Sequence, residues 1–295
     1  MVTDQPVTVR TDLPVTIRTD LPVTIRTDLA HGGRWTSLRA GEREWLWHRP
    51  DPARATVRPG DAFVDAGGLE ECVPTVRGTP DHGDAWSRPW QRDGDADTLH
   101  CPDFVLSRRI DSGPVALRID YELHADPGYR FLWAAHALLD VTPDARLAAP
   151  DATPTRLFPE AAELLARPWP DGAHHLTGPW PAPHGLRLDR LGPDDGTAVG
   201  AILTDCASVT VTDGPDTLTF SLHADADAEV PVSVALWRNL RGFPASAPYR
   251  SIGVEPMLGS VFDLVEAGPG DAAQVPPSGV LRWHLDITAT STRTD

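Results

Sequence analysis

Three ionisable residues of this 295-residue chain stand in surroundings that favour acid–base chemistry. His82 lies in an Asp-His-Gly turn, His136 interrupts the apolar run 131–141, and Glu255 follows an apolar stretch directly before a proline. Unperturbed pKa values of about 4.3 for Glu and about 6.5 for His lie within tuning range of neutrality. Singly, each residue also fits a structural role, as a turn residue, a core histidine or a strand-end acid. Together they predict an acid–base pair and a second histidine that binds or polarises a substrate.

The stretch 67–90 has the composition of a cleft wall. It combines a Gly-Gly turn, a Glu-Glu pair, three prolines and two tryptophans, with Arg88 between Trp86 and Trp90. Such a composition does not favour helices or strands. Small-molecule sites, however, commonly combine aromatic faces with a few polar groups. We therefore predict that this stretch forms one wall of a small-molecule cleft.

Composition and charge narrow the possible partners. The hydrophobic content of 41% is enough for a core, and the formal net charge of -16 argues against nucleic acid or an anionic membrane as the main partner. The chain contains no lysine, which excludes Schiff-base chemistry and a Walker-type phosphate loop. No apolar run approaches the roughly 20 residues that span a bilayer, and the start lacks a signal-peptide core. We expect a soluble cytoplasmic protein, monomeric or homodimeric.

The cysteines do not form a recognisable site. Cys72, Cys101 and Cys206 are odd in number and far apart in sequence. This pattern resembles neither a disulfide framework nor a closely spaced metal site. We interpret them as free thiols of the interior. No metal site is predicted, because no group of possible ligands in the sequence has a credible metal-site spacing.

The rest of the chain indicates one all-β domain. Residues 3–26 repeat an octapeptide of the form TDLPVTIR, so residues 1–29 are expected to be mobile or to form an edge strand, and residues 30–291 to form a single domain. Many short strands, frequent turn signals and one short helix predict a large antiparallel β-sandwich. The run 131–141 fits a doubly buried strand or a short helix. The predicted strands are 35–38, 45–47, 104–110, 115–123, 198–203, 208–212, 217–223, 230–237, 249–255 and 280–290, and the predicted helix is 159–165.

Several of these pieces resemble the aldose 1-epimerase, or galactose mutarotase, family. They occur in the family's order and cover about residues 30 to 290, as the segments 32–38, 67–68, 81–90, 133–136 and 253–256. The resemblance implies a galactose mutarotase-like supersandwich that binds a small carbohydrate in a cleft and needs no cofactor. By position, His136 matches the general acid that protonates the ring oxygen, and Glu255 matches the base that deprotonates the anomeric hydroxyl. His82 matches the histidine that orients the sugar near its ring oxygen.

The resemblance also suggests residues that bind the sugar. Flat faces for a pyranose are expected from Trp86, Trp90, Trp133 and Trp237, and partners for its hydroxyls from Arg88 and Asn239. Glu70 and Glu71 replace the arginine or asparagine usual near the Gly-Gly turn, so we assign Glu71 to substrate binding and expect altered specificity there. Alternatives are a phosphosugar epimerase, a non-catalytic carbohydrate-binding or regulatory module, and a biosynthetic enzyme that uses the same pair on another small molecule.

Overall fold

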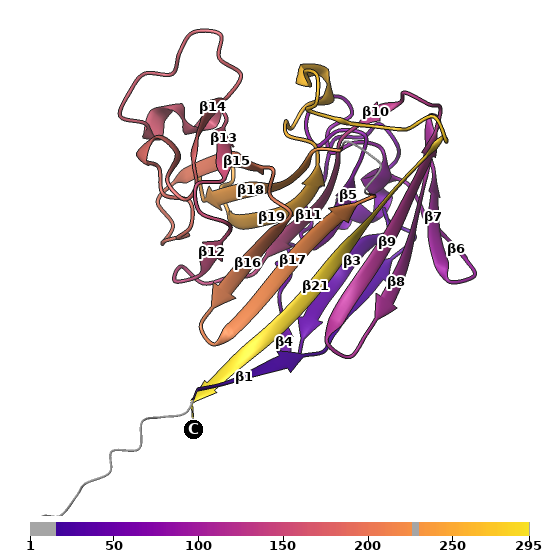
Figure 1. Ribbon diagram of the computed structural model, residues 1–295, viewed down its shortest axis with the longest axis horizontal. Helices are drawn as coiled ribbons and strands as arrows, with labels where there is room; N and C mark the ends of the chain where they lie inside the picture. The colour runs from indigo at the N-terminus through magenta and orange to yellow at the C-terminus, as the bar shows by residue number, and fades with distance from the viewer. Residues whose placement is uncertain (1–15, 226–229, 295) are drawn as a thin grey trace, which may run out of the picture.

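The computed structural model describes residues 16–225 and 230–294, which form two large antiparallel sheets (Figure 1). The core lies between the sheets and takes side chains from both, such as Tyr121 of one and Trp133 of the other. The predicted antiparallel β-sandwich is confirmed. No helix in the described residues combines the length and apolarity needed to cross a membrane.

Within the described chain the first sheet has nine strands, in the order β12-β16-β17-β21-β9-β8-β7-β6, with β1 beside β21. Along β9 (Ala116–Ala125) the inward residues Leu117, Ile119, Tyr121 and Leu123 are at most 1% exposed, as the alternating pattern predicts. The other strands are β1 (Thr16–Leu21), β6 (Gln91–Asp93), β7 (Ala96–His100), β8 (Phe104–Ser112), β12 (Arg146–Ala148), β16 (Ser208–Asp213), β17 (Asp216–Ala224) and β21 (Val280–Thr294).

The second sheet has ten strands in the described chain, in the order β14-β13-β15-β18-β19-β11-β5-β3-β2, with β4 beside β3. Its centre is β11 (Trp133–Leu139), buried at every position, so the middle of the run 131–141 forms a strand with both faces covered. The other strands are β2 (Val23–Asp28), β3 (Arg34–Ala40), β4 (Arg43–Glu44), β5 (Leu69–Cys72), β13 (Pro154–Leu157), β14 (Leu176–Pro179), β15 (Thr197–Thr204), β18 (Val232–Leu240) and β19 (Arg250–Leu258).

Helical structure in the described residues is limited to short 3₁₀ turns. The predicted helix is one of them, η3, which begins at Pro159, where the missing N–H of proline is tolerated. The five turns are η1 (Pro52–Thr56), η2 (Ala85–Ser87), η3 (Pro159–Leu164), η4 (Pro183–Gly185) and η5 (Leu264–Glu266), and the small pair β10 (Arg130–Phe131) and β20 (Ala273–Gln274) completes the fold.

The octapeptide repeats enter the fold at the margins of the sheets. Residues 1–15 lie outside the described residues. The following residues form β1, which pairs with the end of β21, and β2, which pairs with β3 at the sheet edge. Val23 of β2 is buried in the main core, so the last repeat unit is packed with residues 30–291.

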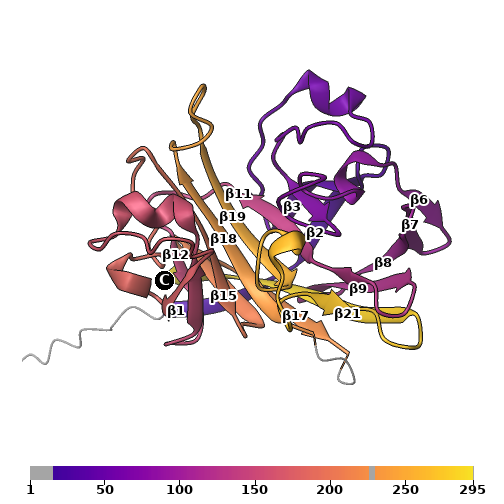
Figure 2. The same ribbon diagram turned by 90° about the horizontal axis from the view of Figure 1, so that it is seen from above.

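Long connections lie on the face of the ten-stranded sheet that points away from the nine-stranded sheet. Figure 2 shows the β18–β19 connection and the segment with η1 rising on that side, opposite the nine-stranded sheet. These connections form the walls around the middle of the sheet, where the candidate catalytic residues lie.

Candidate active site

His136 and Glu255 lie directly opposite each other on the neighbouring strands β11 and β19. The register pairs Ala134 with Met257 and Leu138 with Gly253, which places His136 across from Glu255. Their side chains meet, with Nδ1 of His136 2.9 Å from Oε1 of Glu255. Both residues are buried, at 7% and 2% exposure, so two segments far apart in the sequence supply one shielded acid–base pair.

Strand alternation directs this pair away from the main core. Successive side chains of a strand point to opposite faces of the sheet. Trp133 and Ala135 of β11 therefore face the main core, whereas Ala134 and His136 face the other side. On that side a smaller apolar cluster, including Ala134, Ala235 and Met257, packs beside the pair and limits its contact with water.

The electrostatics of the pair favour an imidazolium beside a carboxylate. Burial lowers the pKa of His136, but the nearby carboxylates, Glu255 foremost, outweigh it and raise the pKa above its usual value. Among the described residues, Nδ1 of His136 and Oε2 of Glu255 have no hydrogen-bond partner, so the 2.9 Å contact is a close ion pair whose alignment is poor. Oε2 of Glu255 is therefore a buried acceptor whose hydrogen-bonding capacity the described residues do not use.

His82 joins the pair from the loop between β5 and η2. Its ring centroid lies 5.1 Å from that of His136, and its backbone has the positive φ of 60° that few non-glycine residues adopt. The next residue, Gly83, has no space for a side chain, because a Cβ there would overlap the carbonyl oxygen of Val73. The turn is thus held by close backbone packing, which fixes the histidine over the sheet.

Phe63 and Asp81 orient the ring of His82. Phe63 stacks on the imidazole at 3.6 Å between centroids, and Nδ1 of His82 lies 3.0 Å from Oδ1 of Asp81. Burial and the neighbouring His136 lower the pKa of His82, although Asp81 acts in the opposite sense. In a neutral ring that donates Nδ1–H to an ionised carboxylate, Nε2 is an acceptor. This histidine is therefore suited to accept a hydrogen bond from a substrate.

A cavity of about 980 Å³ opens beside these three residues. Its volume is at the upper end of the roughly 300–1,000 Å³ usual for small-molecule sites. Trp237 lines it from β18, and Phe243 from the β18–β19 connection packs edge-on against Trp237 at 5.8 Å. The charged residues of its lining are Arg49, Asp51, Asp65, Arg77, Asp81, Glu160, Glu163 and Glu255.

The structure corrects the assignment of Trp133 and Glu71 to substrate binding. Both are fully buried on the core face, because each stands an odd number of positions from a site-facing residue of its strand. Glu71 accepts hydrogen bonds from Trp133 Nε1 at 2.7 Å, Tyr121 Oη at 2.9 Å and Arg108 Nη1 at 3.0 Å. This network neutralises a carboxylate between the sheets and does not reach the cavity.

The predicted wall 67–90 also contributes less to the cavity than expected. Trp86 is buried behind Phe63, and its Nε1 donates to the carbonyl of Asp81 at 3.1 Å. Trp90 packs under Arg108, and Arg88 is paired with Asp84 at 3.2 Å. Among the described residues that line the cavity, Trp86, Arg88 and Trp90 are all absent. Trp86, through its hydrogen bond to Asp81, supports the loop that holds His82.

Asn239 is likewise structural, whereas Trp237 lies where it was expected. Asn239 is fully buried; its side chain donates to the carbonyl of Phe243 and accepts from the backbone N–H groups of Gly242 and Phe243. It thereby shapes the β18–β19 connection that carries Phe243 to the cavity. Trp237 stands two positions earlier on β18 and lines the cavity itself.

Glu70 is the member of the Glu-Glu pair that lies on the site side. It faces His136 from β5 and is held by Arg54, whose Nε and Nη2 donate to its two oxygens at 3.0 Å. Burial raises the pKa of Glu70 to about 7, against the opposing effect of Arg54 and Arg34. Glu70 does not line the cavity, and it supports the floor of the site as the strand neighbour of His136.

The sequence interpretation missed Phe63, Asp65 and Tyr249. Phe63 and Asp65 come from the irregular segment before β5, and Tyr249 lies just before β19. Tyr249 donates its hydroxyl to Asp65 and stacks with Trp47 at 5.3 Å. The signal for Tyr249 was present, since an aromatic residue stands at the end of a proline-containing loop that leads to the strand of Glu255.

The two antiparallel sheets, the near absence of helix in the described residues and the fold comparisons together define a galactose mutarotase-like sandwich. No protein-family model matches the chain, and no curated protein matches it in sequence. Solved structures do match, among them the Slr1438 protein of Synechocystis sp. PCC 6803, at a TM-score of 0.64 and 15% identity over 98% of this chain and 100% of the other.

Two further matches carry names of this class. A galactose mutarotase-like protein from Lactobacillus casei has a TM-score of 0.58 at 17% identity, covering 94% of this chain and 99% of that one. A galactose mutarotase related enzyme from Lactobacillus acidophilus has a TM-score of 0.60 at 13% identity, covering 94% and 97%. These identities establish the shared fold, and the chemistry must be argued from the residues of the site.

Proposed function

We propose that this protein is a cofactor-independent, aldose 1-epimerase-like isomerase that interconverts the anomers of a sugar. The observation that carries the proposal is the buried pair of His136 and Glu255, 2.9 Å apart across two strands at the cavity. An imidazolium beside a carboxylate is already an acid and a base in the protonation states that ring opening requires.

Each residue has one proton to transfer. Glu255 takes the proton of the anomeric hydroxyl through its unpartnered oxygen, while His136 gives a proton to the ring oxygen. The bond between C1 and the ring oxygen breaks, and the open-chain aldehyde forms. Rotation about C1–C2 presents the other face of the carbonyl, and reversal of both proton transfers closes the ring as the other anomer. Each transfer contributes about 10²–10⁴-fold to the rate.

Other cavity residues position the sugar for this reaction. His82, with Nδ1 held by Asp81, accepts a hydrogen bond from a sugar hydroxyl near the ring oxygen. Trp237 and Phe243 provide apolar faces for the C–H side of a pyranose. Aromatic faces with a few fixed polar groups are the usual composition of a small-molecule site.

The charge of the cavity favours a neutral sugar over a phosphorylated one. Its acids outnumber its two arginines, and Arg77 is already paired with Glu160 at 2.7 Å. Arg49 lies over the ring of Tyr249. An incoming phosphate would meet like charge, and the described part of the cavity lining offers it no free cluster of arginines, so the phosphosugar alternative is disfavoured.

Polarimetry tests the proposal. Freshly dissolved α-glucose and α-galactose, and their 6-phosphates, are followed with and without protein. We expect faster equilibration of at least one neutral aldose and a weaker effect on its phosphate. If no aldose is accelerated but equilibrium dialysis detects sugar binding, the protein is a carbohydrate-binding module and the isomerase proposal fails.

A further inference from the structure

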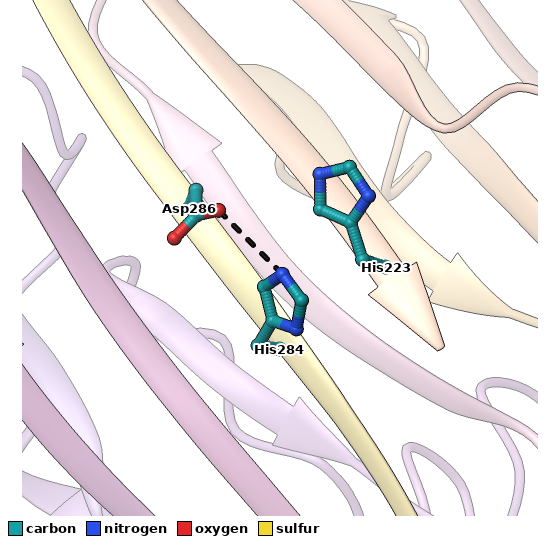
Figure 3. A group of neighbouring side chains, drawn as sticks. All are labelled: His223, His284 and Asp286. Atoms are coloured by element: carbon teal, nitrogen blue, oxygen red, sulfur yellow. Dashed lines mark ion pairs between the residues drawn. The ribbon is translucent and has the colours of Figure 1, made fainter. Parts of the chain in front are cut away.

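A second cluster of chemically reactive side chains lies on the outer face of the nine-stranded sheet. His223 of β17 and His284 of β21 are directly opposite in the strand register, and Asp286 follows two positions later on the same face of β21. Figure 3 shows the three side chains gathered on the two neighbouring strands. Leu222 and Leu285, the alternate neighbours, face the core, so the cluster points away from the sandwich.

The geometry of the cluster is close to that of a three-ligand metal site. The two imidazole rings are stacked at 4.8 Å between centroids, and Nε2 of His284 lies 3.6 Å from Oδ2 of Asp286. One ligand atom from each residue lies within 4.8 Å of the other two. Tetrahedral zinc with bonds of about 2.0–2.2 Å requires ligand atoms about 3.4 Å apart. Small rotations of these partly exposed side chains cover the difference.

The surrounding charges leave the site attractive to a cation. Asp120 of β9 is the register partner of His284 on the other side, and it adds a second carboxylate. Arg118 contacts both carboxylates: its Nε donates to Asp120 at 3.0 Å, and its Nη1 is 4.0 Å from Asp286. Two carboxylates therefore outweigh one arginine, in a chain whose net charge is -16.

We propose that His223, His284 and Asp286 bind a divalent metal ion of the zinc class, with water completing the coordination. Two imidazoles and one carboxylate suit zinc, copper or nickel better than the oxygen-preferring magnesium or calcium. Among the described residues this is the one group of three histidines, cysteines or acids with such geometry, and it lies apart from the catalytic cavity. No sequence pattern indicates this site, because His223 is 61 residues before His284.

Metal binding at this place would add a cross-link between two strands that already pair with each other. β17 and β21 are antiparallel neighbours from Asp216 opposite Ser291 to Ala224 opposite Trp283, and the ion would link them again on the outside of the sheet. A ligand that binds the folded state and not the unfolded state raises stability by mass action. The consequence is a zinc-dependent increase in melting temperature that is independent of sugar chemistry.

Titration calorimetry with zinc chloride on the full chain tests the site. We expect one ion per chain and a raised melting temperature. His223→Ala and His284→Ala should each lower the zinc affinity by about tenfold or more, since the loss of a residue that only hydrogen-bonds to a metal ligand already lowers affinity by about 10–100-fold. Asp286→Asn should weaken binding as well. His100→Ala, an exposed histidine on β7, is the matched control and should bind like the wild type.

Each result of the zinc titration either supports or refutes the proposed metal site. The substituted side chains are at the surface, and circular dichroism of the variants without metal verifies that they fold. Equal zinc affinity in the wild type and in the double variant His223→Ala/His284→Ala would overturn the proposal, as would the absence of binding at millimolar zinc. Because polarimetry does not enter this test, failure of the metal site and failure of the isomerase proposal are distinguishable.

Discussion

Gly253 leaves open the space that the carboxylate of Glu255 occupies. The two residues are two positions apart on β19 and share its site face, and a Cβ atom at Gly253 would overlap Oε1 of Glu255. The same Cβ would lie 3.0 Å from Cβ of Trp237 on the neighbouring strand, so it could not move aside. The absence of a side chain at Gly253 therefore sets the position of the proposed base.

Gly253→Ala should reduce turnover with little loss of fold. The added methyl group displaces the Glu255 carboxylate, and a misplacement of about 1 Å can lower a rate by about 10²-fold. The measurement is the mutarotation rate by polarimetry, with circular dichroism to verify folding. Gly113→Ala, in the turn between β8 and β9, is the control and should retain the wild-type rate. A wild-type rate in Gly253→Ala would show that this crowding does not control the site.

The proton affinity of His136 should depend on Glu255. In the wild type we expect a pKa above the usual value of about 6.5, because the carboxylate outweighs burial. In Glu255→Gln the main opposing charge is gone, burial dominates, and the pKa should fall below that value. Titration of the His136 ring by NMR measures both. An unchanged pKa in the variant would mean that the two side chains are not electrostatically coupled in solution.

The same shift predicts how stability and activity change with pH. A histidine whose pKa is raised on folding stabilises the folded state fully below its unfolded pKa, and this contribution is lost as pH rises through the folded pKa. The proposed acid must also be protonated to act. Turnover and the His136 contribution to stability should therefore both decline on the alkaline side, above about pH 6.5. Urea unfolding of wild type and His136→Gln across this range measures the stability part.

Glu71→Gln should destabilise the protein without affecting sugar binding. The substitution leaves the guanidinium of Arg108 buried beside a neutral partner, with Asp97 as its remaining carboxylate at 3.5 Å. Removing one partner of a buried pair costs about 3–5 kcal/mol. Urea unfolding gives the free-energy change, and the KM of the surviving folded protein gives the sugar affinity. A raised KM at unchanged stability would instead restore Glu71 to the substrate site.

Trp237 should contribute to sugar affinity more than to stability. Its side chain is partly exposed and lines the cavity. Trp237→Ala removes a stacking face, and a loss of about 1.4 kcal/mol, within the range for aromatic contacts, raises KM about tenfold. Trp90→Phe changes a buried tryptophan outside the cavity lining, whose Nε1 has no hydrogen-bond partner in the described residues, and serves as the comparison, with an unchanged KM. Equal effects of the two substitutions would contradict the placement of Trp237 as the sugar-facing tryptophan.

Sequence patterns identified several long strands because the sandwich is built from alternation, but the predicted strand 45–47 is wrong, since only isolated bridges occur there. The predicted segments 104–110, 208–212 and 217–223 fall within β8, β16 and β17. The same alternation could have excluded Trp133, since a residue three positions from His136 on a strand must face the other way. The face on which Trp133 lies could not be assigned from the sequence, because an uninterrupted apolar run such as 131–141 shows neither a helical nor a strand period. The assignment required the knowledge that this run forms a strand.

The cavity itself was harder to predict because it is assembled from irregular segments. Phe63 and Asp65 come from a segment without periodic pattern, and Arg77 faces Glu160 across 83 residues of chain. The direction of such side chains is set by tertiary packing. The sequence could identify His82, His136 and Glu255 as candidates only by their residue types. The fold brings these three residues together.

The proposed role of Glu255 as the catalytic base is tested by the mutarotation rate of Glu255→Gln, compared with that of the wild type on the same aldose. Glutamine keeps the shape of the side chain and removes its ability to take a proton. If Glu255 is the base at the anomeric centre, the variant remains folded, binds sugar, and loses about 10²–10⁴-fold in turnover. A folded variant that accelerates mutarotation as fast as the wild type would show that Glu255 is not the base.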